Sequence, residues 1–321
     1  MAANGRYAIG WICAVATEFV AARLVLDAEH GQPQYLAPCD TNQYCLGSIG
    51  DHNVVITVLP EARYRHGTSA AATVVTNMLN SFPNVRIGLA VGLGVGASNE
   101  TKDIRLGDIV VSTSRADENG DLHYDCGKFL QNKPFERARM LHRSPTVLRT
   151  AIAGLRADHE INGHLIEEVI EDTLTKYSNL RRKYGRPSEE SESHHIRPDH
   201  CTEGCALPTG DGFLTSPDRD EDDRIMIHYG TINSSNRLMR DAKTRDRVST
   251  EENILCFEKE AALLMDLLPC VAIRGICGYS NSPPNQDWQR YAALVAAAYA
   301  KELLLVMVPR SVEGEDRAQR H

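Results

Sequence analysis

The sequence predicts an α/β fold, because short apolar runs that suit buried strands alternate with segments that suit helices. Residues 7–14 and 86–95 are nearly continuous apolar runs, as expected of strands covered on both faces of a sheet. Residues 288–307 are rich in alanine and predict a long helix. A chain of 321 residues that is 42% hydrophobic can bury a substantial core in one large domain or two small ones.

The first strand leads into a helix that carries a candidate catalytic carboxylate. Thr17 is placed to cap this helix, with Phe19, Ala22 and Leu26 along its apolar side. Glu18 then lies in the first helical turn, just beyond the strand end. From the residues alone, a surface carboxylate stabilised by the helix dipole is the more ordinary interpretation.

The next elements end at a glycine-rich turn. Residues 30–42 have loop composition, residues 53–59 predict a strand and residues 68–79 predict a helix of small residues. The buried strand that follows closes in Gly-Leu-Gly-Val-Gly-Ala at residues 92–97. A dinucleotide-binding turn needs a helix straight afterwards, but residues 98–105 are short and polar. The turn therefore predicts close approach of a ligand to the backbone without a nucleotide-binding βαβ unit.

The middle of the chain combines a strand, a helix and a charged insertion. Residues 106–112 predict a strand and residues 147–156 a helix, while the polar residues 117–145 are expected to wrap the site or a subunit contact. Residues 175–223 are charged and poor in large apolar side chains, so we expect a long mobile insertion. The insertion contains histidines and cysteines whose spacing allows a zinc clip, although exposed loop residues are the simpler expectation: His194, His195, His200, Cys201 and Cys205.

The C-terminal part contains two strand ends that should face one crevice. In the stretch 256–262 a short apolar strand runs into acidic residues that open an alanine-rich helix, and residues 271–280 predict a buried strand with a small-residue end. Residues 227–232 predict another strand, and the polar residues 309–321 predict a frayed tail. Ligands of α/β proteins sit at the carboxyl ends of strands, so the crevice is the predicted site.

The bulk composition excludes several classes of function. The net charge of −8 without a basic stripe argues against nucleic-acid and membrane-surface binding. No apolar run reaches the roughly 18 residues of a membrane span, and residues 1–7 lack a signal-peptide core. The nine scattered cysteines suggest reduced thiols in a cytoplasmic protein. No cofactor motif is present, so none is expected.

Four segments together resemble the nucleoside phosphorylase superfamily, and within it the fungal branch similar to methylthioadenosine/S-adenosylhomocysteine nucleosidase. The segments are residues 8–18, 106–112, 256–262 and 271–280, and the resemblance extends over residues 7–308 apart from the insertion. It implies one three-layer α/β/α domain with a mixed central sheet. It also implies a homo-oligomer that acts on a small nucleoside-like molecule.

The resemblance assigns roles to particular residues. Glu18 matches the carboxylate that activates the attacking water, and Glu260 matches the carboxylate that binds the ribose hydroxyls. Substrate-binding positions fall in the glycine-rich turn, in the turn after residue 232 and beside the ribose carboxylate: Gly92, Leu93, Leu238, Met239, Glu258 and Gly278. Phosphorolytic relatives hold phosphate with an Arg and a Ser or Thr where this chain has Ala90 and Leu93. Water is therefore the expected co-substrate.

Two residues depart from the family pattern at the site. Gly278 stands where the family has an Asp that protonates or hydrogen-bonds purine N7, and only Asp287 is near enough in sequence to replace it. Loss of such an acid costs on the order of 100- to 10,000-fold in rate. Lys259 replaces a Met beside the sugar, where it could bind an anion or act as acid, base or imine-forming amine; alternatively, it is a solvated surface lysine.

Three functions remain open from the sequence. The first is hydrolysis of a nucleoside N-glycosidic bond with Glu18 and Glu260, weakened or altered by Gly278. The second is a nucleosidase pocket repurposed for another small molecule in specialised metabolism, with Glu18, Lys259 and Glu260 as the reactive groups. The third is a non-catalytic ligand-sensing module. Fold alone does not decide between them.

Overall fold

The computed structural model confirms an α/β fold with helices on both faces of a mixed central sheet. It describes residues 3–60, 68–97, 103–113, 122–128, 136–142, 144–188, 224–234, 249–250, 253–259, 261–279 and 286–317. The predicted zinc clip and most of the predicted insertion lie outside these residues, as do Leu238, Met239 and Glu260.

The described strands form one sheet in the order β2-β3-β4-β1-β5-β11-β6-β9-β7-β8. Strand β1 is parallel to both β4 and β5, and β5 is parallel to β11, whereas β11 and β6 are antiparallel. The bounds are β1 Ile9–Cys13, β2 Ala28–Glu29, β3 Tyr44–Ile49, β4 His52–Val58, β5 Ile87–Gly96, β6 Ile109–Ser112, β7 Leu122–Lys128, β8 Glu136–His142, β9 Ile227–Ser234, β10 Ile254–Glu258 and β11 Cys270–Tyr279.

Strand β10 closes half of this sheet into a barrel. It pairs in parallel with β9 on one side and antiparallel with the end of β5 on the other. The circuit β5-β11-β6-β9-β10 therefore returns to β5. Strand β1 is not part of this circuit. Its pairing with β5 stops at Ala90, whereas the pairing of β10 with β5 begins at Val95. A gap is left beside β5 between these two residues.

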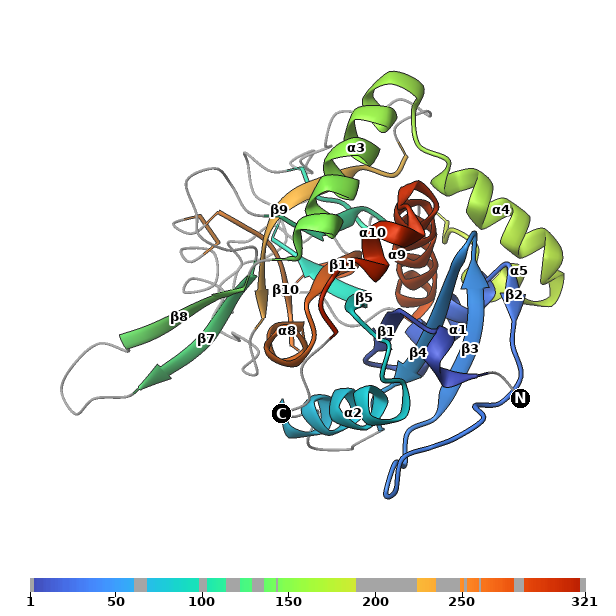
Figure 1. Ribbon diagram of the computed structural model, residues 1–321. Helices are drawn as coiled ribbons and strands as arrows, with labels where there is room; N and C mark the ends of the chain where they lie inside the picture. Colours follow the sequence, from blue (N-terminus) through green and yellow to red (C-terminus); the bar gives the residue numbers. More distant parts are fainter. Residues whose placement is uncertain are drawn as a thin grey trace, which may run out of the picture.

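The helices cover the sheet in two layers (Figure 1). Helix α9 packs on β11 and β5 and contacts α1, α3, α4 and α5, whereas α2 and α8 pack together on the other face. Close contacts at three glycines show which face of the sheet each helix layer covers. A Cβ at Gly10 or Gly88 would meet Leu268, just after α8, whereas a Cβ at Gly275 would meet Ala292 of α9. The bounds are α1 Ala16–Leu24, α2 Thr68–Ser81, α3 Thr146–Asn162, α4 Ile166–Lys176, α5 Arg181–Tyr184, α8 Ala261–Leu267, α9 Gln286–Val306 and α10 Pro309–Glu313.

The alanine-rich composition of α9 is explained by its central position. Its residues 291–300 are all buried, so small side chains are needed to let the sheet and the surrounding helices approach its backbone. Trp288, Tyr291 and Tyr299 are the buried aromatic side chains of this helix. The prediction of a long helix here is confirmed.

Several local expectations differ from the structure. The N-cap of α1 is Val15 instead of Thr17, because the Glu18 side chain itself accepts the Val15 N–H. The polar residues 117–145 include the hairpin β7–β8, which extends away from the body of the molecule (Figure 1). Residues 175–184, expected in the mobile insertion, complete α4 and form two short helical turns that bury Tyr184.

The tail also differs in part from the expectation. Residues 309–313 form α10, which buries Val312, and the Arg86 guanidinium donates to the Glu315 carbonyl. Among the helices of the described residues, none has the length and hydropathy to cross a lipid bilayer.

The packing of β11 on α9 predicts a strong effect of one added methyl group. A Cβ at Gly275 would lie 2.0 Å from the Ala292 carbonyl oxygen, so Gly275→Ala must push strand and helix apart. We expect the free energy of unfolding in urea to fall by about 1–3 kcal/mol. Gly278→Ala is the matched control, because no atom of the described residues lies within 4 Å of its Cβ position, and it should change stability by less than about 0.5 kcal/mol. Equal stability of the two variants would contradict this packing.

Candidate active site

Glu18 is a buried carboxylate held at the junction of β1 and α1. The residue is only 5% exposed. One carboxylate oxygen, Oε2, accepts the N–H groups of Ala14 (2.6 Å) and Val15 (3.2 Å), which β1 no longer pairs and α1 does not yet use. The other, Oε1, accepts the N–H of Leu93 (2.8 Å). Glu18 thus occupies the gap beside β5 where β1 has ended.

The glycine-rich turn is shaped to admit this carboxylate. A Cβ at Gly92 would lie 2.3 Å from Glu18 Oε1 and 2.6 Å from Arg274 Nη1, so only glycine lets the two charged groups meet over the strand. Gly92 and Leu93 were predicted from the resemblance to bind substrate. Their direct partners in this structure are Glu18 and Arg274, and substrate contact remains a prediction.

Arg274 supplies the positive charge beside Glu18, and its role was not identified from the sequence. It is 2% exposed in the middle of β11, and its Nη2 donates to Glu258 Oε2 at 2.6 Å. Glu258 Oε2 also accepts the N–H of Ala261 (2.9 Å), the first residue of α8. The signal that could have identified Arg274 is a single charged residue inside an otherwise apolar strand, because such a residue needs a buried partner.

The pKa of Glu18 is raised because burial penalises the charged carboxylate. The positive charge of Arg274 opposes this effect most strongly, followed by the three backbone N–H groups that the carboxylate accepts. Such a carboxylate can exchange a proton closer to neutral pH than an ordinary Glu, which suits a general base.

The remaining predicted residues lie around this cluster. Lys259 is half-buried and directly follows β10. Gly278 is half-buried near the end of β11, where the register with β5 shifts, and none of the residues that the structure describes has an atom within 4 Å of its Cβ position. Asp287, considered as a replacement acid, is 70% exposed at the start of α9 and forms an ion pair with Arg290 (3.1 Å), which makes it a surface carboxylate.

The cysteines near the cluster are poor nucleophiles. Six cysteines are free thiols: Cys13, Cys39, Cys45, Cys256, Cys270 and Cys277. Burial raises the pKa of Cys277 to about 12 and raises the pKa of Cys13 and Cys256 as well. The thiolate is the reactive form, so these residues act as small buried side chains. Among the described residues, no three His, Cys, Asp or Glu side chains are grouped as a metal ion requires.

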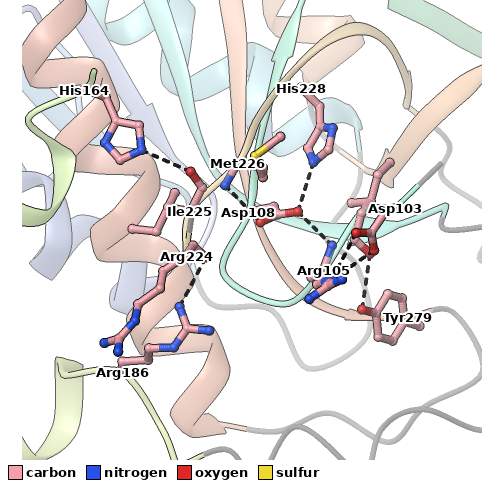
Figure 2. A network of polar contacts seen from close by, with 11 residues as sticks. Asp103, Arg105, Asp108, His164, Arg186, Arg224, Ile225, Met226, His228 and Tyr279 are labelled. Atoms are coloured by element: carbon pink, nitrogen blue, oxygen red, sulfur yellow. Dashed lines mark hydrogen bonds and ion pairs between the residues drawn. The ribbon is translucent and has the colours of Figure 1, made fainter. Parts of the chain in front are cut away.

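A second polar network fixes the strand end that carries Gly278 (Figure 2). The buried Asp108 carboxylate accepts the N–H groups of Arg105 (2.8 Å) and Met226 (3.1 Å) and contacts His228 Nε2 (2.9 Å). It therefore ties the start of β6 to the start of β9.

Two backbone bonds connect the same region to β11. Ile276 N–H donates to the Asp108 carbonyl and Gly107 N–H donates to the Ile276 carbonyl, both at 2.8 Å. The Tyr279 hydroxyl donates to the Ile104 carbonyl at 3.2 Å. The residues on both sides of Gly278 are thus anchored, while no described residue fills the space at its Cβ position.

Solved structures of known proteins share this architecture. The methylthioadenosine/S-adenosylhomocysteine nucleosidase of Helicobacter pylori has a TM-score of 0.55 and 12% identity, over 94% of this chain and 98% of that chain. The corresponding nucleosidase of Neisseria meningitidis has a TM-score of 0.55 and 13% identity over 92% and 98%. Futalosine hydrolase of Helicobacter pylori has a TM-score of 0.55 and 12% identity over 93% and 97%.

The chain has the nucleosidase fold. At these identities the likeness concerns the fold alone. No protein-family model matches the chain. A nucleotide-binding leucine-rich repeat (NLR)-like protein of Hyaloscypha variabilis is 39% identical over 307 residues, which are 96% of this chain but only 30% of that protein. The chain therefore spans less than a third of the length of this relative.

The buried ion pair predicts a large stability effect at Arg274. Arg274→Met removes the partner of Glu258 and the counter-charge near Glu18, so we expect the free energy of unfolding to fall by about 3–5 kcal/mol at neutral pH. Arg23→Met is the control, because Arg23 and Glu29 are 45% and 43% exposed and such pairs contribute about 0–1 kcal/mol. An Arg274→Met protein as stable as the control in urea would show that the cluster does not depend on this cation.

Proposed function

We propose that this domain hydrolyses the N-glycosidic bond of a nucleoside, with Glu18 as the base that activates water. The observation that carries the proposal is the buried Glu18 carboxylate, held by three backbone N–H groups beside Arg274 in a domain of nucleosidase fold. A preorganised base of raised pKa can take a proton from water as the sugar develops oxocarbenium character.

Water is the proposed co-substrate in place of phosphate. Residues 90–96 contain no Arg, Ser or Thr that could hold a phosphate dianion. The nearby Arg274 guanidinium is already bonded to Glu258. In the same proposal the substrate is a purine nucleoside or a methylthioadenosine-like compound. Glu260 binds its ribose hydroxyls, its purine base lies near Leu238 and Met239, and the domain is a cytoplasmic homo-oligomer of the fungal branch.

A ligand-sensing role is the second candidate, and the NLR-like relative favours it. This chain matches 30% of that protein, which is the arrangement expected of one module within a larger multidomain protein. A nucleosidase pocket that binds a nucleoside without turning it over would serve as a sensor. A repurposed enzyme that uses Lys259 on a different small molecule is the third possibility, favoured by the half-buried position of Lys259 beside Glu258.

The role of Glu18 predicts both a variant effect and a pH dependence. Glu18→Ala should lower kcat/KM for base release by about 100- to 10,000-fold. A base must be ionised to act, so wild-type activity should fall as the pH drops through the Glu18 pKa, and this limb should lie above the ordinary pKa of a Glu. The measurement is chromatographic detection of free base from a nucleoside panel, with and without phosphate, across pH.

The same panel separates the candidates. Base release that needs phosphate would contradict the hydrolytic mechanism. Release that is unaffected by Glu18→Ala would contradict the assignment of the base. Tight binding of a nucleoside without any release would support the sensing module.

A further inference from the structure

Two histidines at the turn between α3 and α4 lie close together, away from the cluster around Glu18. His159 is in the last turn of α3, and His164 follows Gly163, whose positive φ of 76° suits a glycine at this turn. The two imidazole rings have centroids 6.0 Å apart and meet edge to face at 74°. Both residues are half-buried, so the pair is a feature of the folded chain that needs an explanation.

Each ring has one nitrogen fixed by a hydrogen-bond acceptor. His164 Nε2 lies 3.1 Å from the Ile225 carbonyl oxygen, which can only accept, so this nitrogen carries the hydrogen (Figure 2). His159 Nε2 lies 2.9 Å from Glu302 Oε2, and the other oxygen of this carboxylate accepts the N–H of Leu165 at 2.6 Å. An ionised carboxylate is also an acceptor only, which assigns the hydrogen of His159 to Nε2 as well.

The second nitrogen of each ring, Nδ1, then carries a lone pair in the neutral imidazole. Both Nδ1 atoms are shielded from solvent, and among the described residues neither His159 nor His164 has a hydrogen-bond partner at this atom. A buried acceptor without a partner costs free energy. Two such lone pairs on neighbouring rings therefore indicate a ligand that accepts electron pairs.

The contacts of both rings match those of metal-binding histidines. A histidine that binds a metal through one nitrogen almost always donates its other N–H to a carboxylate or a backbone carbonyl, which fixes the tautomer and the ring orientation. His159 has the carboxylate and His164 has the carbonyl. Metal–nitrogen distances of about 2.0–2.1 Å place an ion about 3.2 Å from each ring centre, so rings that share one ion have centres up to about 6.4 Å apart. The observed 6.0 Å lies within this limit.

The ligand type selects the class of cation. Imidazole nitrogen suits Zn, Cu and Ni, and among the divalent ions Cu²⁺ binds a given nitrogen site most tightly, whereas Ca²⁺ and Mg²⁺ need oxygen ligands. The described residues hold no group of three His, Cys, Asp or Glu side chains, so the chain supplies two ligands here and water completes the coordination. The negative charge of Glu302 raises the basicity of the His159 ring and favours a bound cation.

We propose that His159 and His164 bind a late first-row transition-metal cation through their Nδ1 atoms, with Cu²⁺ held most tightly. The proposal does not depend on the proposed hydrolysis, because the site uses none of the residues assigned to it. A bound ion ties the α3–α4 turn to the segment that enters β9, since the Ile225 carbonyl holds His164 and the next N–H along the chain, that of Met226, donates to Asp108.

The first test observes the imidazole nitrogens directly. Side-chain ¹⁵N resonances of the histidines are recorded by NMR while Zn²⁺, a diamagnetic ion, is added. We expect the Nδ1 resonances of His159 and His164 to shift together on binding of a single ion, while Nε2 of both rings keeps its hydrogen. No shift at these two Nδ1 atoms, or coordination through Nε2, would overturn the proposal.

The second test measures the Kd for Cu²⁺, with the nitrogen ligands counted by electron paramagnetic resonance. The chain has 12 histidines, so both tests use a protein that lacks the side chains of the predicted zinc clip, through the substitutions His194→Gln, His195→Gln, His200→Gln, Cys201→Ser and Cys205→Ser. In this protein His159→Gln and His164→Gln should each raise the Kd by at least about tenfold, and Glu302→Gln, which alters only the partner of His159, by about 10- to 100-fold.

The matched control is His52→Gln. His52 is also buried with Nε2 against a backbone carbonyl, that of Met307 at 3.0 Å, and its loss should leave the Kd unchanged. A Kd that is unaffected by either His159→Gln or His164→Gln would overturn the two-histidine site, as would a Cu²⁺ spectrum without two imidazole nitrogens. Thermal unfolding without metal checks that each variant is folded, and the NMR test decides where one is not.

Discussion

The site depends on one guanidinium shared by two buried carboxylates. Arg274 donates to Glu258 and lies close to Glu18 over Gly92, and all three charged groups are nearly inaccessible to water. A carboxylate buried without a counter-charge would either be protonated or destabilise the fold. Arg274 places a positive charge beside both carboxylates, and its position within β11 fixes where they can lie.

The topology of the sheet explains how a carboxylate can enter its interior. Strand β1 ends at Cys13, and β10 joins β5 only from Val95 onward. The N–H of Leu93 lies between these two partners and would otherwise be an unpaired buried donor. Glu18 satisfies it and also satisfies two N–H groups at the start of α1. The interruption of strand pairing beside β5 therefore provides backbone N–H groups that hold Glu18, the proposed base.

This arrangement separates rigid from variable parts of the site. The base is fixed by backbone bonds from β1, α1 and β5, and the end of β11 is fixed by the Asp108 network. Gly278 lies between these two supports, and within the described part of the chain no atom comes within 4 Å of its Cβ position. A side chain introduced at Gly278 would therefore leave these two supports in place.

The sequence predicts the fold well because the buried strands and α9 are long, strongly patterned segments. From the residue pattern alone Glu18 was interpreted as a surface carboxylate, and only the family resemblance marked it as a site residue; the structure buries it, because the carboxylate takes up backbone N–H groups from β5 and from the start of α1. Arg274 was missed because a single charge inside an apolar run does not reveal its partner, which comes from a strand 16 residues earlier in the chain. The prediction of Thr17 as the helix N-cap is wrong for a similar reason. Only in the folded chain does the Glu18 side chain accept the Val15 N–H at the start of α1.

The most direct test of this account is the pKa of Glu18 itself, measured by the pH dependence of its side-chain carboxyl carbon resonance in wild type and in Arg274→Met. We predict a pKa above the ordinary Glu value in the wild type, because burial outweighs the stabilising groups, and a further increase in the variant, because the largest opposing charge is gone. A wild-type pKa at or below the ordinary value, or one that does not rise in Arg274→Met, would contradict the claim that this cation governs the buried carboxylate.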